Sequence, residues 1–244
     1  MIRKFKSVMM LLSMVLLLQG CAITEDIVEQ TIDEVETTLE EAVTAETQES
    51  DSEQIDVKLE ISMEEAIEIG ATEAATYYDD LQLSAVYSYD GDELREEDAG
   101  VDGKRQLWYV NFANEESNLV HLLIKNGEIE RVHTYDESGN YGLIDTSIIT
   151  MTAQDAVDKS IELGLRGGNP DKPEEWVSGF NFNLVYGSLT EAPEEVQLFI
   201  EVIGISQNDN FAHVIFDAET STLLLAEEKV VDENGDVIEW RELH

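Results

Sequence analysis

Two segments of the chain place apolar and polar residues with a helical period, and they match each other at an offset of 90 residues. Residues 61–67 read ISMEEAI and residues 151–157 read MTAQDAV. Small and apolar side chains then recur about once per helical turn, which predicts a helix with one buried face in each segment. These positions are Ala66, Ile67, Gly70, Ala71, Ala74, Ala75 and Tyr78 in the first, and Ala156, Val157, Ser160, Ile161, Gly164 and Leu165 in the second.

Both predicted helices begin with the same capping pattern. A hydroxyl residue, Ser62 or Thr152, is followed three positions later by an acid, Glu65 or Asp155. The hydroxyl can accept a hydrogen bond from a free backbone N–H of the first turn, and the acid is favourable near the positive helix end. Gly164 indicates the end of the second helix.

Each helix is followed by apolar residues that alternate or run together as in strands. The first set of predicted strands covers 81–89, 107–112, 118–124 and 128–135, with a hairpin turn at Asn126 and Gly127. The second set covers 179–186, 196–205, 211–216, 222–227 and 237–240, with a turn at 208–210. An acidic segment containing glycines, 90–103, is expected to be a turn.

This order of elements predicts an α+β fold with an internal repeat. Each repeat is expected to pack one N-terminal helix on an antiparallel sheet of about four strands. The predicted domains are residues 61–146 and 147–244.

The N-terminus has the pattern of an export signal. Arg3, Lys4 and Lys6 precede an apolar run, 8–18, that is too short to span a bilayer. The run ends in Leu18-Gln19-Gly20-Cys21, which resembles a bacterial lipobox. The resemblance implies that residues 1–20 are removed as a signal peptide and that Cys21 carries lipid. The alternative is an ordinary secretory leader with a chance cysteine.

The following segment, 21–60, is strongly acidic. From Ala22 to Glu60 there are 14 acidic residues and one basic residue. Apolar residues at helical spacing within 28–42 allow an amphipathic helix that docks on a partner. Because like charges extend a chain, we favour the other interpretation, a mostly disordered tether.

Composition narrows the possible functions. The chain of 244 residues has 54 acidic and 14 basic residues, a net charge of −40. Nucleic acid is not expected as a partner, because its phosphates would be repelled. The one cysteine excludes an intrachain disulfide framework.

The second repeat carries a motif, 214–223, that reads VIFDAETSTL and resembles the late motif of the PepSY domain family. Ser221 stands where that family usually has glycine, and the first repeat retains only the weaker match 122–129. PepSY domains occur in protease propeptides and bacterial envelope proteins. The resemblance implies that this protein binds or regulates a protein partner, with peptidases among the candidates.

No local motif predicts catalysis. The histidines are His121, His133, His213 and His244. None has a recognised metal spacing, and no Gly-x-Ser-x-Gly or phosphate-binding loop occurs. His121 and His213 fall on equivalent predicted strands, which leaves two interpretations: a shared site, or the favoured one, histidines on a strand surface.

The remaining candidate groups also have structural interpretations. Paired carboxylates are interpreted as a solvated surface, and the turns after Asp136 and Asp232 lack a calcium-loop pattern. The aromatic residues in or near strands are interpreted as core, with a ligand-stacking face as the alternative. They are Trp108, Tyr109, Phe112, Trp176, Phe180, Phe182, Phe199 and Phe211.

The sequence therefore predicts a non-enzymatic lipoprotein, anchored to the cell membrane and facing the extracytoplasmic side, that binds a protein or peptide of the cell envelope. No catalytic residue, metal site or cofactor is predicted, and the ligand-binding residues stay unassigned. The alternative is an acidic surface module that binds cations or a cationic ligand.

Overall fold

A computed structural model describes residues 59–88, 96–136, 142–168, 177–189, 196–233 and 235–243. All of them belong to one compact unit, Asp56–His244. The predicted signal peptide, Cys21 and nearly all of the predicted tether lie outside the described residues.

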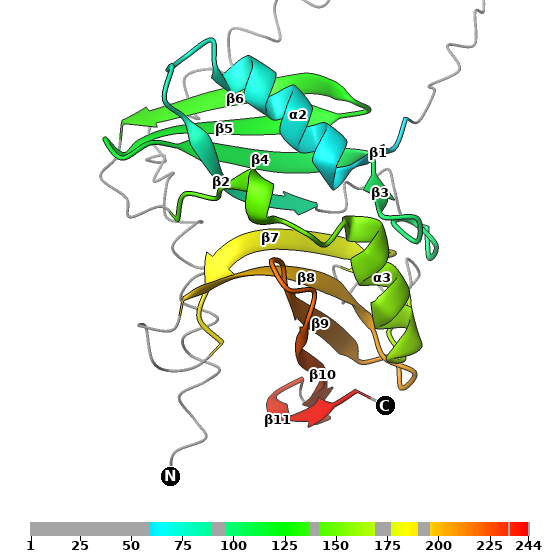
Figure 1. The fold of residues 1–244 in the computed structure, drawn as a ribbon. Helices are drawn as coiled ribbons and strands as arrows, with labels where there is room; N and C mark the ends of the chain where they lie inside the picture. The colour runs from blue at the N-terminus through cyan, green and yellow to red at the C-terminus, as the bar shows by residue number, and fades with distance from the viewer. Residues whose placement is uncertain are drawn as a thin grey trace, which may run out of the picture. The chain divides into compact units, whose positions relative to one another are not determined.

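The described unit has an α+β fold built from two α-helices and a large antiparallel sheet (Figure 1). The helices are α2 (Met63–Ala74) and α3 (Ala153–Glu162), and a short 3-10 helix, η2, covers Thr146–Ile148. The strands of the large sheet are β2 (Gln82–Ser88), β4 (Leu107–Ala113), β5 (Asn118–Lys125), β6 (Glu128–Asp136), β7 (Asn181–Gly187), β8 (Gln197–Ile205), β9 (Phe211–Asp217), β10 (Leu223–Val231) and β11 (Val237–Glu242). A separate two-stranded sheet pairs β1 (Ile61–Ser62) with β3 (Lys104–Arg105).

The strands predicted for two sheets form one sheet of nine strands, ordered β11-β10-β9-β8-β7-β2-β4-β5-β6. The join is the antiparallel pair β2–β7, in which Val86 lies opposite Leu184. Hydrophobic alternation identifies a strand and its buried face, but it does not identify the neighbouring strand. The sequence pattern therefore predicts the strands but not the pairing of β2 with β7.

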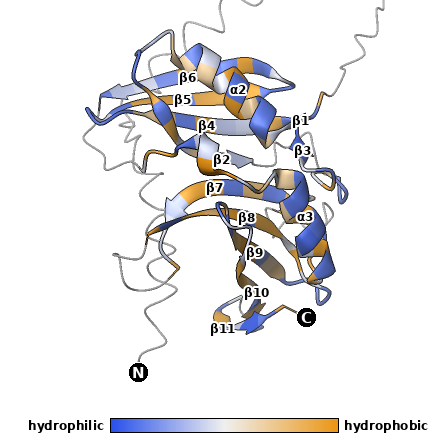
Figure 2. Ribbon diagram, in the orientation of Figure 1, coloured by the Kyte–Doolittle hydropathy of each residue, from blue (hydrophilic) through white to orange (hydrophobic). Residues whose placement is uncertain are grey.

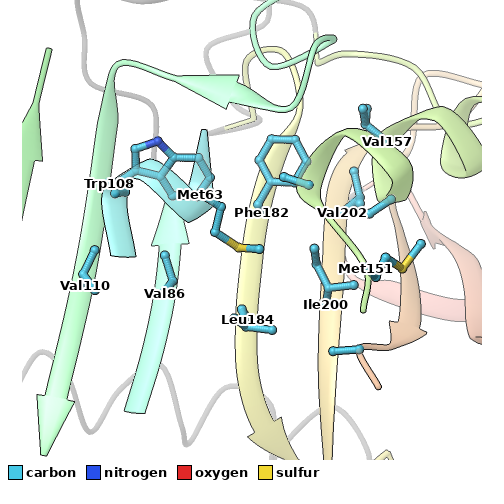
Figure 3. Close-up of a cluster of buried hydrophobic side chains, with 14 of the residues drawn as sticks. Met63, Val86, Trp108, Val110, Met151, Val157, Phe182, Leu184, Ile200 and Val202 are labelled. Carbon is cyan, nitrogen blue, oxygen red and sulfur yellow. The ribbon is translucent and has the colours of Figure 1, made fainter. Parts of the chain in front are cut away.

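A single hydrophobic core covers one face of this sheet and includes residues from both sets of strands. Trp108 of β4 and Phe182 of β7 stack with ring centroids 6.0 Å apart. Figure 3 shows them beside Val86 and Leu184, with the core continuing to Ile200 and Met151. The two helices pack on this face, and Figure 2 shows mainly hydrophilic residues on the outer side of α3. Neither described helix is long and apolar enough to cross a membrane.

The predicted helix starts are confirmed. Ser62 and Thr152 each accept a hydrogen bond from the backbone N–H three residues on, and the carboxylates of Glu65 and Asp155 accept one from the backbone N–H of the cap residue. The first helix ends at Ala74, earlier than the apolar spacing suggested. The hydroxyl of Tyr78, beyond that end, donates a hydrogen bond to Asp136 at 3.1 Å.

The predicted hairpin turn and the predicted helix end at Gly164 are confirmed, and a further turn follows β9. Asn126 and Gly127 have positive φ angles of 52° and 76°, as a tight hairpin turn requires. Gly164, just after α3, has φ 94°. At the end of β9, Asp217 Oδ1 accepts hydrogen bonds from the backbone N–H groups of Glu219 and Thr220, at 3.0 and 2.7 Å.

Three details differ from the predictions. No strand was predicted between the turn 90–103 and the strand at 107, but Lys104–Arg105 pairs with Ile61–Ser62. The 3-10 helix Thr146–Ile148 was not predicted, and β10 continues to Val231, four residues beyond its predicted end. Elements of two or three residues are too short to show a periodicity, and β10 contains polar residues that obscure its pattern.

Candidate functional site

The face of the sheet opposite the helices carries the histidines of the described strands. Core residues alternate along each strand, so Val214 of β9 and Leu122 of β5 point to the helices. Their neighbours His213 and His121 therefore point the other way. His133 lies directly opposite His121 on the next strand. We call this side of the sheet the histidine face.

His213 is buried on this face between two carboxylates from neighbouring strands. Its side chain is 4% exposed, and Nδ1 lies 2.6 Å from Glu201 Oε1. Nε2 lies 3.4 Å from Glu227 Oε1. Glu201 also accepts a hydrogen bond from Asn183 Nδ2 at 2.7 Å. A polar line thus crosses β7, β8, β9 and β10.

Burial and the two carboxylates have opposite effects on His213. Burial disfavours the charged ring and acts to lower its pKa, but hydrogen bonds and Coulomb attraction from Glu201 and Glu227 outweigh it and raise the pKa to about 9. Burial likewise acts to raise the pKa of Glu201, but His213 and Asn183 outweigh it, and that pKa is lowered. At neutral pH the group is a buried imidazolium between carboxylates.

Two aromatic rings pack beside this ion group. The ring centroids of Trp240 on β11 and His213 are 5.2 Å apart, and Phe211 lies 6.0 Å from His213. Both ring nitrogens of His213 are already engaged by carboxylates. The histidine therefore has no nitrogen directed at a substrate, and the arrangement suits a structural or binding role better than proton transfer.

His121 has a different environment. Its Nδ1 lies 2.6 Å from Asn111 Oδ1, and its ring stacks near Tyr109 with centroids 5.4 Å apart. Burial, together with the nearby His133, lowers the pKa of His121. His121 and His213 share a face but are five strands apart in the sheet order, roughly 24 Å. The structure does not bring them into a shared site.

The favoured interpretation placed His121 and His213 on a strand surface. That prediction is wrong for His213, which is buried. Sequence reasoning missed its partners Glu201, Glu227 and Asn183. Glu201 had a usable signal, because it is the one acid in the apolar run 198–205, LFIEVIGI. A lone acid in a run that reads as a buried strand requires a partner.

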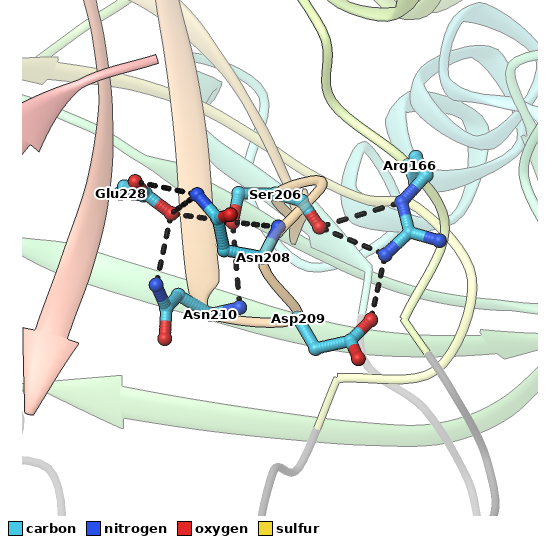
Figure 4. Close-up of polar contacts among 6 residues, drawn as sticks. All are labelled: Arg166, Ser206, Asn208, Asp209, Asn210 and Glu228. Carbon is cyan, nitrogen blue, oxygen red and sulfur yellow. Dashed lines mark hydrogen bonds and ion pairs between the residues drawn. The ribbon is translucent and has the colours of Figure 1, made fainter. Parts of the chain in front are cut away.

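A second polar cluster lies at the β8–β9 turn around the buried carboxylate of Glu228 (Figure 4). The Ser206 hydroxyl donates to Oε2 at 2.5 Å, and Asn210 Nδ2 donates to the same oxygen at 2.9 Å. Asn208 Nδ2 donates to both oxygens, at 3.1 and 3.2 Å. Arg241 of β11 forms an ion pair with Oε1.

These donors determine the charge state of Glu228. Burial acts to raise its pKa, but the hydrogen bonds from Ser206, Asn210, Arg241 and Asn208 outweigh burial and lower the pKa to about 2. Glu228 and its neighbour Glu227 point to opposite faces of β10. Each is bound by a group from another strand or turn, so β10 is held from both sides.

A hollow of about 290 Å³ opens beside Glu228. It is lined by Ser206, Gln207, Asn208, Glu228, Arg241, Glu242 and Leu243. This volume is just below the roughly 300–1,000 Å³ of small-molecule sites. The hollow has room for a side chain, with hydroxyl, amide and carboxylate groups in its wall.

The remaining predicted site residues give no further site. Cys21 and His244 lie outside the described residues. Across the part of the chain that the structure describes, no group of three or more histidine, cysteine, aspartate or glutamate side chains could hold a metal ion.

Comparisons with known proteins add no family. No protein-family model, curated protein or solved structure matches the chain.

Proposed function

We propose that the protein is a non-enzymatic lipoprotein, anchored outside the cytoplasm through Cys21, that binds a protein or peptide partner of the cell envelope. The observation that carries the proposal is the pair of sheet edges. β6 and β11 end the nine-stranded sheet, and no described strand pairs with the outer side of either. Most residues of both strands are exposed. Such edges can accept an extended segment as an additional strand.

We further propose that the two series of elements are a duplicated PepSY-like unit. α2 precedes β2, β4, β5 and β6, and α3 precedes β7, β8, β9 and β10. Each helix starts with a capping box, and the first strands of the two series pair with each other. A gene duplication that kept this order would give the observed sheet. The family resemblance makes a peptidase one candidate partner.

The buried ionisable groups support binding over catalysis. His213 is enclosed by Glu201 and Glu227, and Glu228 is enclosed by Ser206, two amides and Arg241. These networks use the side chains that a catalytic mechanism would need free. The groups hold strands β7 to β11 together instead, which stabilises the sheet up to its β11 edge.

The anchor is tested with the full chain and its Cys21→Ser variant. We expect the natural chain to fractionate with membranes and to incorporate radiolabelled palmitate, and the variant to lose both. Membrane association of the variant at the natural level would contradict the anchor.

The binding role is tested by photocrosslinking the lipidated chain to envelope proteins at low and high salt. We expect a defined crosslinked protein that persists at high salt, because strand pairing is not screened. Loss of every crosslink at moderate salt would favour the alternative, an acidic module that attracts cations or cationic ligands through its −40 charge.

A further inference from the structure

The C-terminal edge of the sheet combines exposed apolar residues, exposed acidic residues and an adjacent hollow. Together these three features favour one kind of ligand. β11 is the last strand in the sheet order (Figure 1). Ile238 on it is 62% exposed, the highest value among the large hydrophobic side chains of the described residues, and Val237 beside it is 36% exposed. Isolated exposed apolar residues are ordinary, but two on an open strand edge favour pairing with another strand.

The polar residues around this apolar pair are almost all acidic. Glu233, Asp236, Glu239 and Glu242 are exposed along the hairpin end and β11. Arg241, the basic residue of this strand, is bound to Glu228. The exposed edge is therefore negative, and its charge complements a basic segment.

The hollow beside Glu228 adds a place for a side chain. Arg241, Glu242 and Leu243 at the end of β11 form part of its wall. Ser206, Gln207 and Asn208 supply hydroxyl and amide groups from the β8–β9 turn. A long side chain of a strand paired with β11 could enter it and reach hydrogen-bond acceptors.

The opposite edge lacks the exposed aliphatic pair and the adjacent hollow. Both edge strands have a bulge in their pairing, β6 with β5 and β11 with β10, and both carry exposed acidic residues. The aliphatic residues of β6, Ile129 and Val132, however, pack against the core. Exposed aliphatic side chains are therefore the feature that distinguishes β11 as an edge for strand pairing.

We infer that β11 is the docking edge for an extended basic peptide segment of the partner, in which Lys or Arg alternates with aliphatic residues. The segment pairs its backbone with the outer side of β11, places its aliphatic side chains against the exposed apolar residues, and places its cations on one face of the strand near Glu239. This inference rests on the proposed binding function and specifies its edge and its ligand.

The test uses a fluorescent nine-residue peptide of alternating Lys and Val, titrated against the purified full chain in detergent. We expect saturable binding that weakens at least about tenfold when alternate peptide nitrogens are methylated, since methylation removes backbone donors but leaves the charge. Ile238→Lys should weaken binding at least about tenfold. Val196→Lys, which changes a similarly exposed residue away from this edge, is the matched control and should bind normally.

Four results would overturn the inference. Equal binding of the methylated peptide would show that charge alone attracts it. Loss of binding in a β6 variant, Tyr135→Lys, with none in Ile238→Lys would place the docking edge on β6, and the proposed binding function would stand. A crosslinked envelope partner unaffected by Ile238→Lys would also leave the proposed function intact while rejecting β11. Absence of both peptide binding and any crosslinked partner would reject both proposals.

Discussion

The indole ring of Trp108 and the phenyl ring of Phe182 stack with centroids 6.0 Å apart, although the residues belong to different series of strands. Trp108 is on β4 and Phe182 on β7, and both are buried. The indole Nε1 also donates a hydrogen bond to the Ile61 carbonyl at 3.0 Å. One stack thus connects the start of α2, the first series and the second series.

Because the core is continuous through this stack, we expect the described unit to unfold in one transition. Phe182→Ala should lower the free energy of unfolding by about 3–5 kcal/mol, the usual result of removing a buried aromatic ring. Urea unfolding followed by tryptophan fluorescence and by circular dichroism measures the change. Tyr135→Ala, an exposed ring on β6, is the control and should change stability little. Two separate transitions, with only the second shifted, would show that the series unfold independently.

The elements could be predicted because local chemistry specifies them. Ser62 and Thr152 marked helix starts, and Asn126-Gly127 marked a hairpin, since each residue type satisfies a local backbone requirement. The pairing of β2 with β7 could not be predicted in this way. The pairing depends on which two strands with buried faces meet, and nothing in the residue types of Val86 and Leu184 identifies them as neighbours.

Most contacts of the candidate site could not be predicted from the sequence. Glu201 and His213 are 12 residues apart and meet only because β8 and β9 pair in a register that sets them on adjacent strands. Glu228 likewise meets the β8–β9 turn through the fold, about 20 residues away in sequence. Among so many acids, only the apolar surroundings of Glu201 distinguished a buried carboxylate from a solvated one.

His213 gives the protein a pH dependence on the alkaline side. Its pKa is about 9 in the folded chain and 6.5 ordinarily, so the folded state binds the proton more tightly. The stabilisation is fully present below about pH 6.5 and is lost as the pH rises through about 9. We expect stability to fall over this range in the natural chain and to change less in His213→Gln. Urea unfolding at several pH values tests this, with the exposed His133→Gln as control. Equal slopes in the natural chain and His213→Gln would contradict the buried imidazolium.

Glu228 gives a dependence on the acid side. Its pKa is lowered to about 2, so its stabilisation is present above the ordinary value of 4.5 and is lost as the pH falls through about 2. Glu228→Ala leaves the donors of Ser206, Asn208 and Asn210 without their acceptor and should cost about 2–3 kcal/mol at neutral pH. Acid and urea unfolding measure both effects. Glu219→Ala removes an exposed carboxylate as the control, and an equal cost in that variant would show that Glu228 has no special role.

Ser221 occupies a backbone conformation that favours glycine. Its φ angle is +56°, in the left-handed region, at the position where the PepSY-like motif usually has glycine. A residue with a Cβ is strained there by roughly 1–2 kcal/mol, while glycine loses roughly 0.5–1 kcal/mol through the greater freedom of the unfolded chain. Ser221→Gly also removes a 3.2 Å contact between the hydroxyls of Ser221 and Thr150. We therefore expect a small gain, about 0.5 kcal/mol, in the free energy of unfolding measured with urea. Thr222→Gly, next along the chain, is the matched control and should destabilise the fold. A loss of stability in Ser221→Gly as large as that in Thr222→Gly would show that the turn does not favour glycine.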